Sequence, residues 1–431
     1  MSSPIRTVRK IAGNLKKARA DHVTRHRPTG FRFAIADDVR FLNPQDWDAA
    51  AGGGGFLMSR PYQQLLADHG PENLSPRYAL IYRDEKPVAA VAAQIVTIEG
   101  NRLVKSQPAT AARGKEETKK SLLKRALAPL GKKAVASLEE RVLICGNLLS
   151  WGRHGVAFAD GESPAELWPA VTEALYRIRR GEKLLGDTAL LVIKDLSPAD
   201  LPDAEVLKTY SYRPADTDPD MVLEVAPEWK NHGDYLASLD RKYRKSVTQI
   251  FTEAEKAGVT LEQVDDVAAH GEALHALYLQ VHLGATVRPV TLTPSFLPEL
   301  ARTAGAGFRC TVARREGRIV GFITTLKDGD TAIGYYIGYD RETAAQGVPL
   351  YLRLLHRTIE DTIALGCKRL SLGRTALEPK ARLGAKPVPL HLWTRHRVPA
   401  LNLVLRRLLS AVPHDEAPER NPFKKGQAAE G

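Results

Sequence analysis

The sequence predicts an α/β protein built from two similar units in tandem, each a twisted mixed sheet flanked by helices. Two apolar hairpins, at 77–103 and 309–333, align at a single offset that places Val88 on Val320. After each hairpin the chain repeats the same succession of strand, Gly-containing loop, helix and strand. The length of 431 residues suits two to three domains of ordinary size.

The first unit begins with its hairpin, whose two apolar runs flank the charged turn 84–86. The stretch "RVLICGNLL" then predicts a strand and leads into the loop "SWGRHGVAF". A helix is expected at about 163–180, because Ser163 and Pro164 are suited to the N-cap and N1 positions. The apolar run "TALLVIKDL" predicts the closing strand.

The second unit opens with "LDRKYRKSVTQIFTEAEKAGV" (239–259), whose apolar residues recur at helical spacing beside a basic face. Its hairpin is followed by a strand at 331–340 and the loop "RETAAQGVPL". A helix at 350–366 and a short strand, "KRLSLG", complete the unit.

The remaining segments set the expected boundaries. The stretch "LSPADLPDAEVLKTYSYRPADTDPD" is rich in Pro and Asp, which predicts a surface connection between the units. We expect a basic helical segment over 1–40, a first domain over 41–215 with a basic insertion at 105–135, a second domain over 216–412 and a disordered tail over 413–431.

The net charge of +12 favours anionic partners such as nucleic acid, a phosphorylated ligand or an anionic membrane surface. The excess of Lys and Arg is concentrated in residues 1–40, 101–135 and 366–407. Within residues 1–20, apolar side chains at helical spacing could contact an anionic membrane or RNA, although a helix packed on the body fits the same pattern.

Several classes of protein are disfavoured. No run of eighteen apolar residues is present, so no membrane span is expected. Cys145, Cys310 and Cys367 are far apart, which indicates core thiols in a reducing compartment and hence a cytoplasmic protein that could lie at a membrane surface. The histidines have no spacing typical of metal ligands, so no metal is expected.

Two groups of residues could carry chemistry. Gln346, Gly347 and Val348 stand where a loop enters a helix, a position that often holds phosphate groups. The loop of the first unit offers Arg153 and His154 at the equivalent place.

The strand 331–340 carries three tyrosines, and a tyrosine could protonate a leaving thiolate or alkoxide. Alternation along the strand predicts Tyr335 and Tyr339 on one face and Tyr336 on the other. Aromatic packing within the sheet is the competing interpretation.

The segment 371–397 combines many cations with one acid, Glu378. A carboxylate there could accept a proton from an amine, or it could simply pair with Lys380. Trp393 is expected in the core, and Arg395 is expected to begin a final helix. The candidates to contact anionic groups of a substrate are Lys380, Arg382 and Lys386.

Three stretches resemble the Fem-type peptidoglycan aminoacyltransferases and the BioF2-like acyltransferase group. They are the basic helix 239–259, the hairpin-to-strand segment 309–373 and the glycine-started "GRTALEPKARLGAKPVPLHLW". The resemblance covers roughly 239–397 and, more loosely, 55–397. It implies two GNAT-like domains.

The resemblance also implies an N-acyltransferase that moves an acyl group directly from a CoA thioester to an amine of a small molecule, peptide or cell-envelope precursor. Donor phosphates would meet Gln346–Val348 with Arg374. The usual phosphate motif is incomplete, with Pro349 next in the chain. Fem-type enzymes use aminoacyl-tRNA, so tRNA is a second candidate donor. A non-catalytic RNA- or membrane-binding protein on a degenerate fold is a third alternative.

Overall fold

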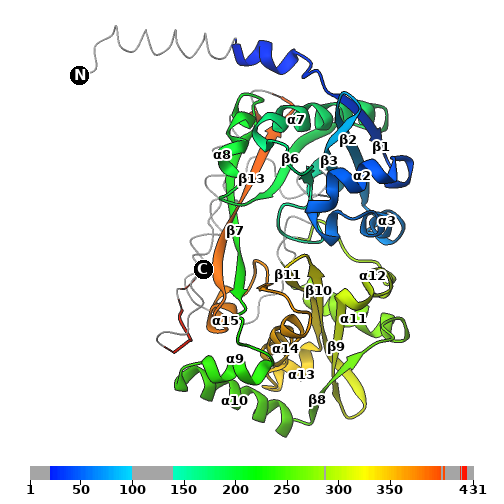
Figure 1. Cartoon of the computed structure of the whole chain (residues 1–431). Coiled ribbons are helices and arrows are strands. Elements are labelled where there is room, and N and C mark those ends of the chain that lie inside the picture. The colour runs from blue at the N-terminus through cyan, green and yellow to red at the C-terminus, as the bar shows by residue number, and fades with distance from the viewer. Residues whose placement is uncertain are drawn as a thin grey trace, which may run out of the picture.

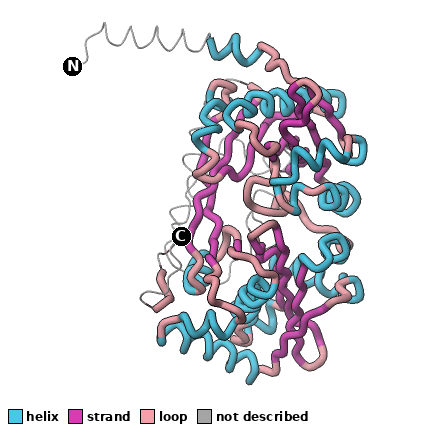
Figure 2. The backbone as a smooth tube through the Cα atoms, viewed as in Figure 1, coloured by secondary structure: helices cyan, strands magenta, loops and turns pink. Residues whose placement is uncertain are grey.

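The computed structural model describes residues 20–99, 139–285, 288–398, 401–402, 418 and 420–424. Two units of sheet and helices lie one above the other and are joined along one side by two long strands, β7 and β13 (Figures 1 and 2). The predicted class, a mixed sheet flanked by helices, is confirmed. The predicted helix within residues 1–20 and the insertion 105–135 lie almost wholly outside the described residues.

The first unit contains most of the predicted elements. Its strands are β1 (Arg32–Ala36), β2 (Leu74–Arg83), β3 (Lys86–Glu99), β4 (Glu139–Cys145), β5 (Val156–Phe158), β6 (Thr188–Leu196) and β7 (Arg213–Glu224). Its helices are α2 (Pro44–Ala51), α3 (Arg60–His69), α7 (Pro164–Gly181) and α8 (Leu201–Ala204). Pro164 is the first residue of α7 after Ser163 at the N-cap, as predicted.

The second unit repeats the order. Its strands are β8 (Val259–Val264), β9 (Phe308–Arg315), β10 (Arg318–Asp328), β11 (Thr331–Tyr339), β12 (Arg369–Ser371) and β13 (Lys386–His396). Its helices are α9 (His232–Ser238), α10 (Arg241–Lys256), α11 (Gly271–His282), α12 (Phe296–Ala304), α13 (Arg341–Ala345), α14 (Leu350–Ala364) and α15 (Leu377–Arg382). The hairpins β2–β3 and β9–β10 turn at the same offset, which confirms the internal repeat.

The strands form one continuous sheet because the units exchange strands. The order is β1-β2-β3-β4-β6-β13-β7-β12-β11-β10-β9-β8, with β5 beside β3. The last strand, β13, pairs with β6 of the first unit, while β7 pairs with β12 of the second. β7 and β13 also pair with each other, in antiparallel register from Lys386↔Val222 to Thr394↔Arg213.

The two cores follow this exchange. Trp393, on β13, is buried against α7 and the first-unit strands, as expected for a core residue. Met221 and Leu223, on β7, are buried beside Leu354 and Ile359 of α14 in the second unit. Each unit therefore buries side chains that the other half of the sequence supplies.

Four sequence predictions need correction. The Pro- and Asp-rich connection contains β7, and the expected boundary at residue 215 falls inside that strand. The segment 1–40 includes β1, whose residues pair with β2, so it is not helical throughout. Arg395 and His396 end β13 and do not begin a helix. Phe423, in the expected disordered tail, packs half-buried against the second unit and pairs with Leu239.

One buried cluster in the second unit makes stability depend on pH. His356 is almost fully buried, its Nδ1 has no hydrogen-bond partner among the described residues, and its ring lies 5.6 Å from that of His232. Burial lowers the pKa of His356 to about 3 and that of His232 to about 4. Both rings are therefore neutral in the folded state at physiological pH.

We predict that the free energy of unfolding falls as pH drops below about 6.5. Between pH 6.5 and the lowered pKa values, the two histidines bind more protons in the unfolded chain than in the folded one. Their contribution to stability is therefore complete above the unfolded pKa and is lost as the pH falls. Each histidine contributes a slope of up to about 1.4 kcal/mol per pH unit. His356→Leu should reduce the slope in urea titrations, and His22→Leu on the surface should not. An unchanged slope in His356→Leu would contradict the assignment.

Candidate functional site

In the described part of the chain each unit has one pair of parallel strands, and the candidate site lies where these pairs end. β11 and β12 pair only over Thr331–Ile333 and Arg369–Ser371. Beyond that point the chain after β12 follows β7, because Leu372 N–H donates to Met221 O at 2.8 Å. The first unit repeats the arrangement, with β4 and β6 paired from Arg141 to Cys145.

A bulge in β11 lies just beyond the point of separation. The register with β10 shifts between Ile323 and Thr325, so that Thr324 faces both Tyr335 and Tyr336. Thr324 Oγ1 accepts from Tyr336 N–H at 3.0 Å. The predicted alternation is therefore wrong: Tyr335 and Tyr336 lie in one cluster with ring centroids 4.7 Å apart, and Tyr339 packs in another.

The tyrosines belong to a hydrogen-bond chain that joins the units. The hydroxyls of Tyr335 and Tyr62 lie 3.0 Å apart, and Asn147 Nδ2 donates to Tyr62 Oη at 2.7 Å. Tyr336 Oη donates to the carbonyl of Leu149 at 3.3 Å. Burial raises the pKa of Tyr62 to about 12 and that of Tyr335 and Tyr336 well above 10. All three are proton donors at neutral pH.

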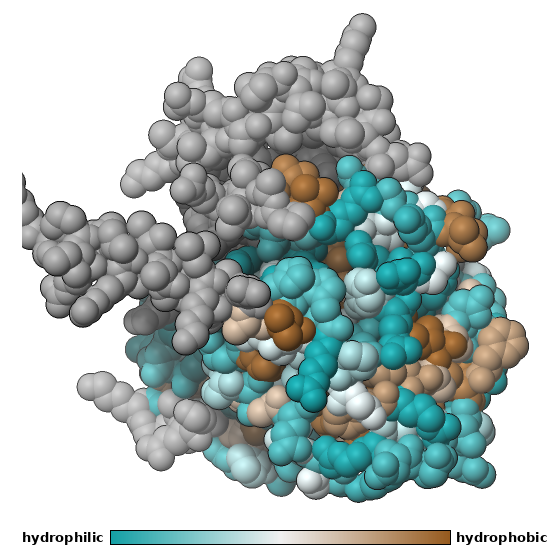
Figure 3. Space-filling model, turned by 90° about the horizontal axis from the view of Figure 1, so that it is seen from above, coloured by the Kyte–Doolittle hydropathy of each residue, from teal (hydrophilic) through white to brown (hydrophobic). Residues whose placement is uncertain are grey.

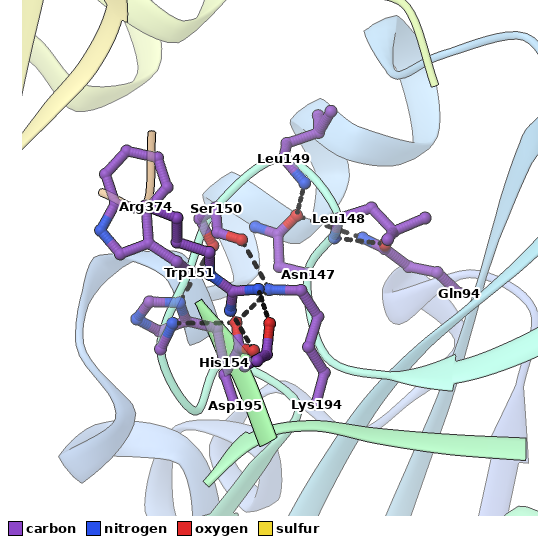
Figure 4. A network of polar contacts seen from close by, with 12 residues as sticks. Gln94, Asn147, Leu148, Leu149, Ser150, Trp151, His154, Lys194, Asp195 and Arg374 are labelled. Carbon is purple, nitrogen blue, oxygen red and sulfur yellow. Dashed lines mark hydrogen bonds and ion pairs between the residues drawn. The ribbon is translucent and has the colours of Figure 1, made fainter. Parts of the chain in front are cut away.

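A buried ionic cluster lies at the end of β6 (Figure 4). Asp195 is fully buried and has a positive φ of 63°, which is uncommon for a residue other than glycine. Lys194 and Arg374 each form an ion pair with it, and Gly152 N–H donates to its Oδ2 at 3.2 Å. Lys194 Nζ also donates to Ser150 O at 2.7 Å. Burial lowers the pKa of Lys194.

A second carboxylate, Asp220 of β7, lies in a neighbouring part of the network. Its oxygens accept from Ser371 Oγ at 2.6 Å and from Gly373 N–H at 2.9 Å, while Trp151 Nε1 donates to Ser371. Burial raises the pKa of Asp220. Lys380 donates to Gly373 O at 3.1 Å, and burial lowers the pKa of Lys380 to about 8.

His154 ties the first unit to the second. Its Nδ1 lies 3.0 Å from Ser150 Oγ, and its Nε2 lies 3.2 Å from Asp328 Oδ2 at the end of β10. The residue types match those of a nucleophilic triad. Ser150, however, is only 5% exposed, so the contacts position the loop after β4 and do not present a nucleophile to solvent.

The site can therefore combine three chemical features. Within the described residues, the β11 edge beyond Ile333 has no neighbouring strand where β12 turns away. Neutral tyrosine hydroxyls adjoin it, and buried cations and carboxylates from both units hold the surrounding loops. Such an arrangement suits polarisation of a carbonyl and protonation of a leaving group.

The structure places the predicted residues in several different environments. Tyr335, Tyr336, His154, Arg374 and Lys380 belong to the network between the units. Arg374 does not join the predicted phosphate loop, because its guanidinium pairs with Asp195.

The predicted phosphate loop lies between α13 and α14. Gln346 Oε1 accepts from Arg315 at 2.7 Å, Gly347 has a φ of +86°, and Val348 is buried. Pro349 at the N-cap of α14 offers no side-chain acceptor to the first turn of the helix.

The other predicted residues lie at the surface or pack elsewhere. Glu378 pairs with Arg382 at 2.9 Å and with Arg420 at 3.1 Å, and not with Lys380. The hydrogen bond from Arg382 lowers the pKa of Glu378, which makes it a poor base. Tyr339 packs on Tyr351. Arg153 pairs with Asp200 at 3.1 Å, and Lys386 is exposed.

Sequence reasoning missed Lys194, Asp195 and Asp220. The one available signal was a Lys-Asp pair at the end of an otherwise apolar strand, where charged side chains need partners. Asp220 gave no signal, because its segment resembled a loop. Nothing in the sequence marks Tyr62, on α3, because only the fold brings it to its partner Tyr335.

A cavity of about 330 Å³ lies elsewhere in the second unit. It is lined by residues of β8, the end of α12 and the start of β9, including Gln263, Phe308 and Arg309. Phe308 belongs to the same apolar cluster as Tyr335, but the cavity lining contains none of the hydrogen-bonded or ion-paired residues of the network, so the site is assigned from side-chain chemistry and not from the shape of this cavity.

Comparison with known proteins identifies the domain of the second unit. Residues 241–381 match the family model of the acetyltransferase (GNAT) domain. The matched segment lies within the second unit and is similar to a GNAT domain, which supports the predicted acyltransferase class. The putative 8-amino-7-oxononanoate synthase 2 of Mycobacterium tuberculosis is 24% identical over 227 residues, which are 51% of this chain and 29% of that protein. The chain thus spans under a third of the relative's length.

Solved structures resemble the chain more distantly. FemX shares 11% identity at a TM-score of 0.45, covering 91% of this chain and 98% of FemX. A tandem GNAT protein from the clavulanic acid biosynthesis pathway shares 13% at a TM-score of 0.45, covering 86% and 99%. L-PGS from Bacillus licheniformis shares 11% at 0.43, covering 80% and 95%.

Two features are absent from the described residues. No helix there has the length and apolarity that crossing a membrane requires. No group of three or more His, Cys, Asp or Glu side chains in that part of the chain could hold a metal ion.

We predict that Asp195→Asn lowers the free energy of unfolding by about 3 kcal/mol, because it leaves the buried Lys194 and the half-buried Arg374 without their shared counter-charge. Asparagine tolerates a positive φ, so the backbone is not the cause of the loss. Denaturant unfolding measures the effect. Asp330→Asn is the matched control, since its pair with Lys368 is exposed on both sides and should contribute about 0–1 kcal/mol. Equal losses in the two variants would refute the importance of the cluster.

Proposed function

We propose that the protein transfers an acyl group from a CoA thioester to an amine, by direct attack in the wedge between β11 and β12. The observation that carries the proposal is the early separation of these parallel strands. Beyond Ile333 the edge of β11 borders the tyrosine cluster and no longer pairs with β12. Backbone N–H groups at such an edge could polarise a thioester carbonyl.

The reaction needs one proton donor for the leaving thiolate. The amine nitrogen attacks the carbonyl carbon, the C–S bond breaks, and the sulfur takes a proton from the tyrosine. The nitrogen loses a proton to solvent, and the tyrosine regains one from solvent. Tyr336 suits this role better than its neighbour, because it is partly exposed and its hydroxyl has only a 3.3 Å contact to a backbone carbonyl. Tyr335 is buried against Tyr62 and would hold the wedge in shape.

The pantetheine and phosphates of the donor would extend towards the loop before α14. The first-turn N–H groups of that helix have no side-chain cap. Arg315 is held beside the loop because its guanidinium donates to Gln346 Oε1. Gly347 has open space beside it, so a phosphate could approach the backbone closely.

An aminoacyl-tRNA donor is the second candidate, and one observation favours it. Four cations at the start of α10 are exposed and form no ion pair with any described residue. They are Arg241, Lys242, Arg244 and Lys245. Phosphate contacts of this kind dominate affinity for nucleic acid. The acceptor amine could belong to a small molecule, a peptide or a cell-envelope precursor under either donor.

The cellular setting is part of the proposal. The three cysteines are free and buried, which agrees with a reducing, cytoplasmic compartment. Residues 1–20 could add contact with an anionic membrane through their apolar and basic residues.

We predict that Tyr336→Phe lowers kcat for acyl transfer by about 100-fold or more, with little change in KM for the CoA ester, because only the leaving group loses its proton donor. Steady-state kinetics with an acetyl- or longer acyl-CoA and a panel of amines would measure this. Tyr339→Phe is the control, since that ring packs on Tyr351 outside the wedge. Equal activity of Tyr336→Phe and wild type would exclude Tyr336 as the donor.

We also predict that CoA at about 100 times its Kd raises the free energy of unfolding by about 2.7 kcal/mol. Gly347→Asp should abolish this increase by placing a carboxylate near the phosphates. Gly317→Asp is a matched control, because Gly317 also has positive φ and open space but lies in the β9–β10 turn. Stabilisation by aminoacyl-tRNA and not by CoA, lost on charge reversal in α10, would favour the second donor.

A further inference from the structure

Two leucine side chains are exposed to solvent at the end of the first unit. They lie in the short 3-10 helix η5 (Glu182–Leu185), where Leu184 is 97% exposed and Leu185 is 71% exposed. Buried ion pairs hold the turn that carries them. Its buried Glu182 accepts from Arg77 at 2.6 Å and from Arg141 at 2.7 Å. The leucines therefore project from a fixed backbone and not from a fraying end.

Cations from three elements lie at the same end of the unit as these leucines. The last turn of α7 supplies Arg179 and Arg180, and η5 itself supplies Lys183. The end of β13 lies alongside, because Arg397 N–H donates to Ala189 O at 2.9 Å and its side chain pairs with Asp187. This places Arg395 opposite Leu191 of β6.

The helix formed by residues 20–26 extends the same surface. Arg25 donates to Ser211 Oγ at 2.7 Å, which fixes the helix beside the start of β7. Asn402 bridges the two regions by donating to Ser211 O at 2.8 Å and accepting from His396 N–H at 3.0 Å. Burial lowers the pKa of Arg25, and the nearby charges of Arg395 and Arg213 lower it further. Val23 and Leu401 add exposed apolar side chains at this end.

The positive charge at this end is largely uncompensated. Arg179, Arg180, Lys183 and Arg395 form no ion pair with a carboxylate in the described part of the chain; Arg180 donates instead to Tyr176 Oη at 3.2 Å. A soluble surface normally intersperses both signs of charge. Figure 3 looks down on this end of the molecule and shows apolar residues lying among hydrophilic ones.

We propose that this leucine–arginine face, formed by Arg179, Arg180, Lys183, Leu184, Leu185 and Arg395, docks on an anionic lipid bilayer. Apolar side chains that insert at the headgroup level and cations that contact lipid phosphates are the two contributions to interfacial binding. RNA would satisfy the cations but would leave the two leucines in water. The proposal concerns folded residues outside 1–20 and does not depend on the acyl-transfer chemistry.

The test uses the full chain and sedimentation with lipid vesicles. Wild-type protein should bind vesicles of phosphatidylcholine mixed with phosphatidylglycerol, bind phosphatidylcholine alone weakly, and lose binding as salt rises. Leu184→Ser with Leu185→Ser should reduce partitioning at least about tenfold, since both side chains lose their gain on leaving water. Arg180→Glu with Lys183→Glu should reduce it as well, and both variants should keep the wild-type melting temperature.

Leu283→Ser is the matched control, because Leu283 is 59% exposed at the end of α11 in the other unit. Its partitioning should equal that of wild type. Unchanged binding in the leucine variant would overturn the proposal, as it would assign membrane contact to another segment such as residues 1–20. Binding of the wild type to tRNA but not to vesicles would overturn it equally. Acyl transfer to a soluble amine should be the same in all these variants, so failure here is distinct from failure of the proposed activity.

Discussion

The exchange of β7 and β13 is the constraint on which the rest of the structure depends. The two strands form an antiparallel ribbon that crosses from one unit to the other, and each completes a sheet whose remaining strands come from the other half of the sequence. Trp393 fills the first core from the end of the chain, while Met221 and Leu223 fill the second core from the middle. The two halves are therefore one cooperative unit in packing, although the repeat makes them two units in sequence.

The candidate site borders this ribbon on both sides. Asp220 belongs to β7, Ser371 is the last residue of β12 and Arg374 follows it, and Lys194 and Asp195 lie near the end of β6. Buried charges are costly unless they are paired. The ionic cluster and the strand exchange are consequently interdependent, since neither Asp195 nor Arg374 would find its partner if each half folded alone. What the cluster contributes to function is position: it fixes the loop after β4 against the edge of β11.

The sequence was informative wherever structure is local. β6 occupies the residues of one apolar run, and the two hairpins turn where charged residues interrupt apolar ones. β7 was missed because its prolines and aspartates resemble those of a loop, and because Thr394, opposite Arg213, lies 181 residues away. The bulge at Tyr335 and Tyr336 depends on Thr324 in the neighbouring strand, so alternation along one strand could not reveal it. The acyltransferase class followed from resemblance, whereas the partners of Tyr62 and Asp195 required the fold.

The position of β13 near the end of the chain affects how the protein is made. During synthesis, β1 to β6 leave the ribosome long before residues 386–396. In the described structure, however, one edge of β6 pairs with β4 and the other edge pairs with β13. An unpaired apolar edge is prone to join other chains. The β6 edge of the first unit therefore stays unpaired until β13 has been synthesised. Synthesis of the whole chain, and not of its first half, is the event that closes the sheet.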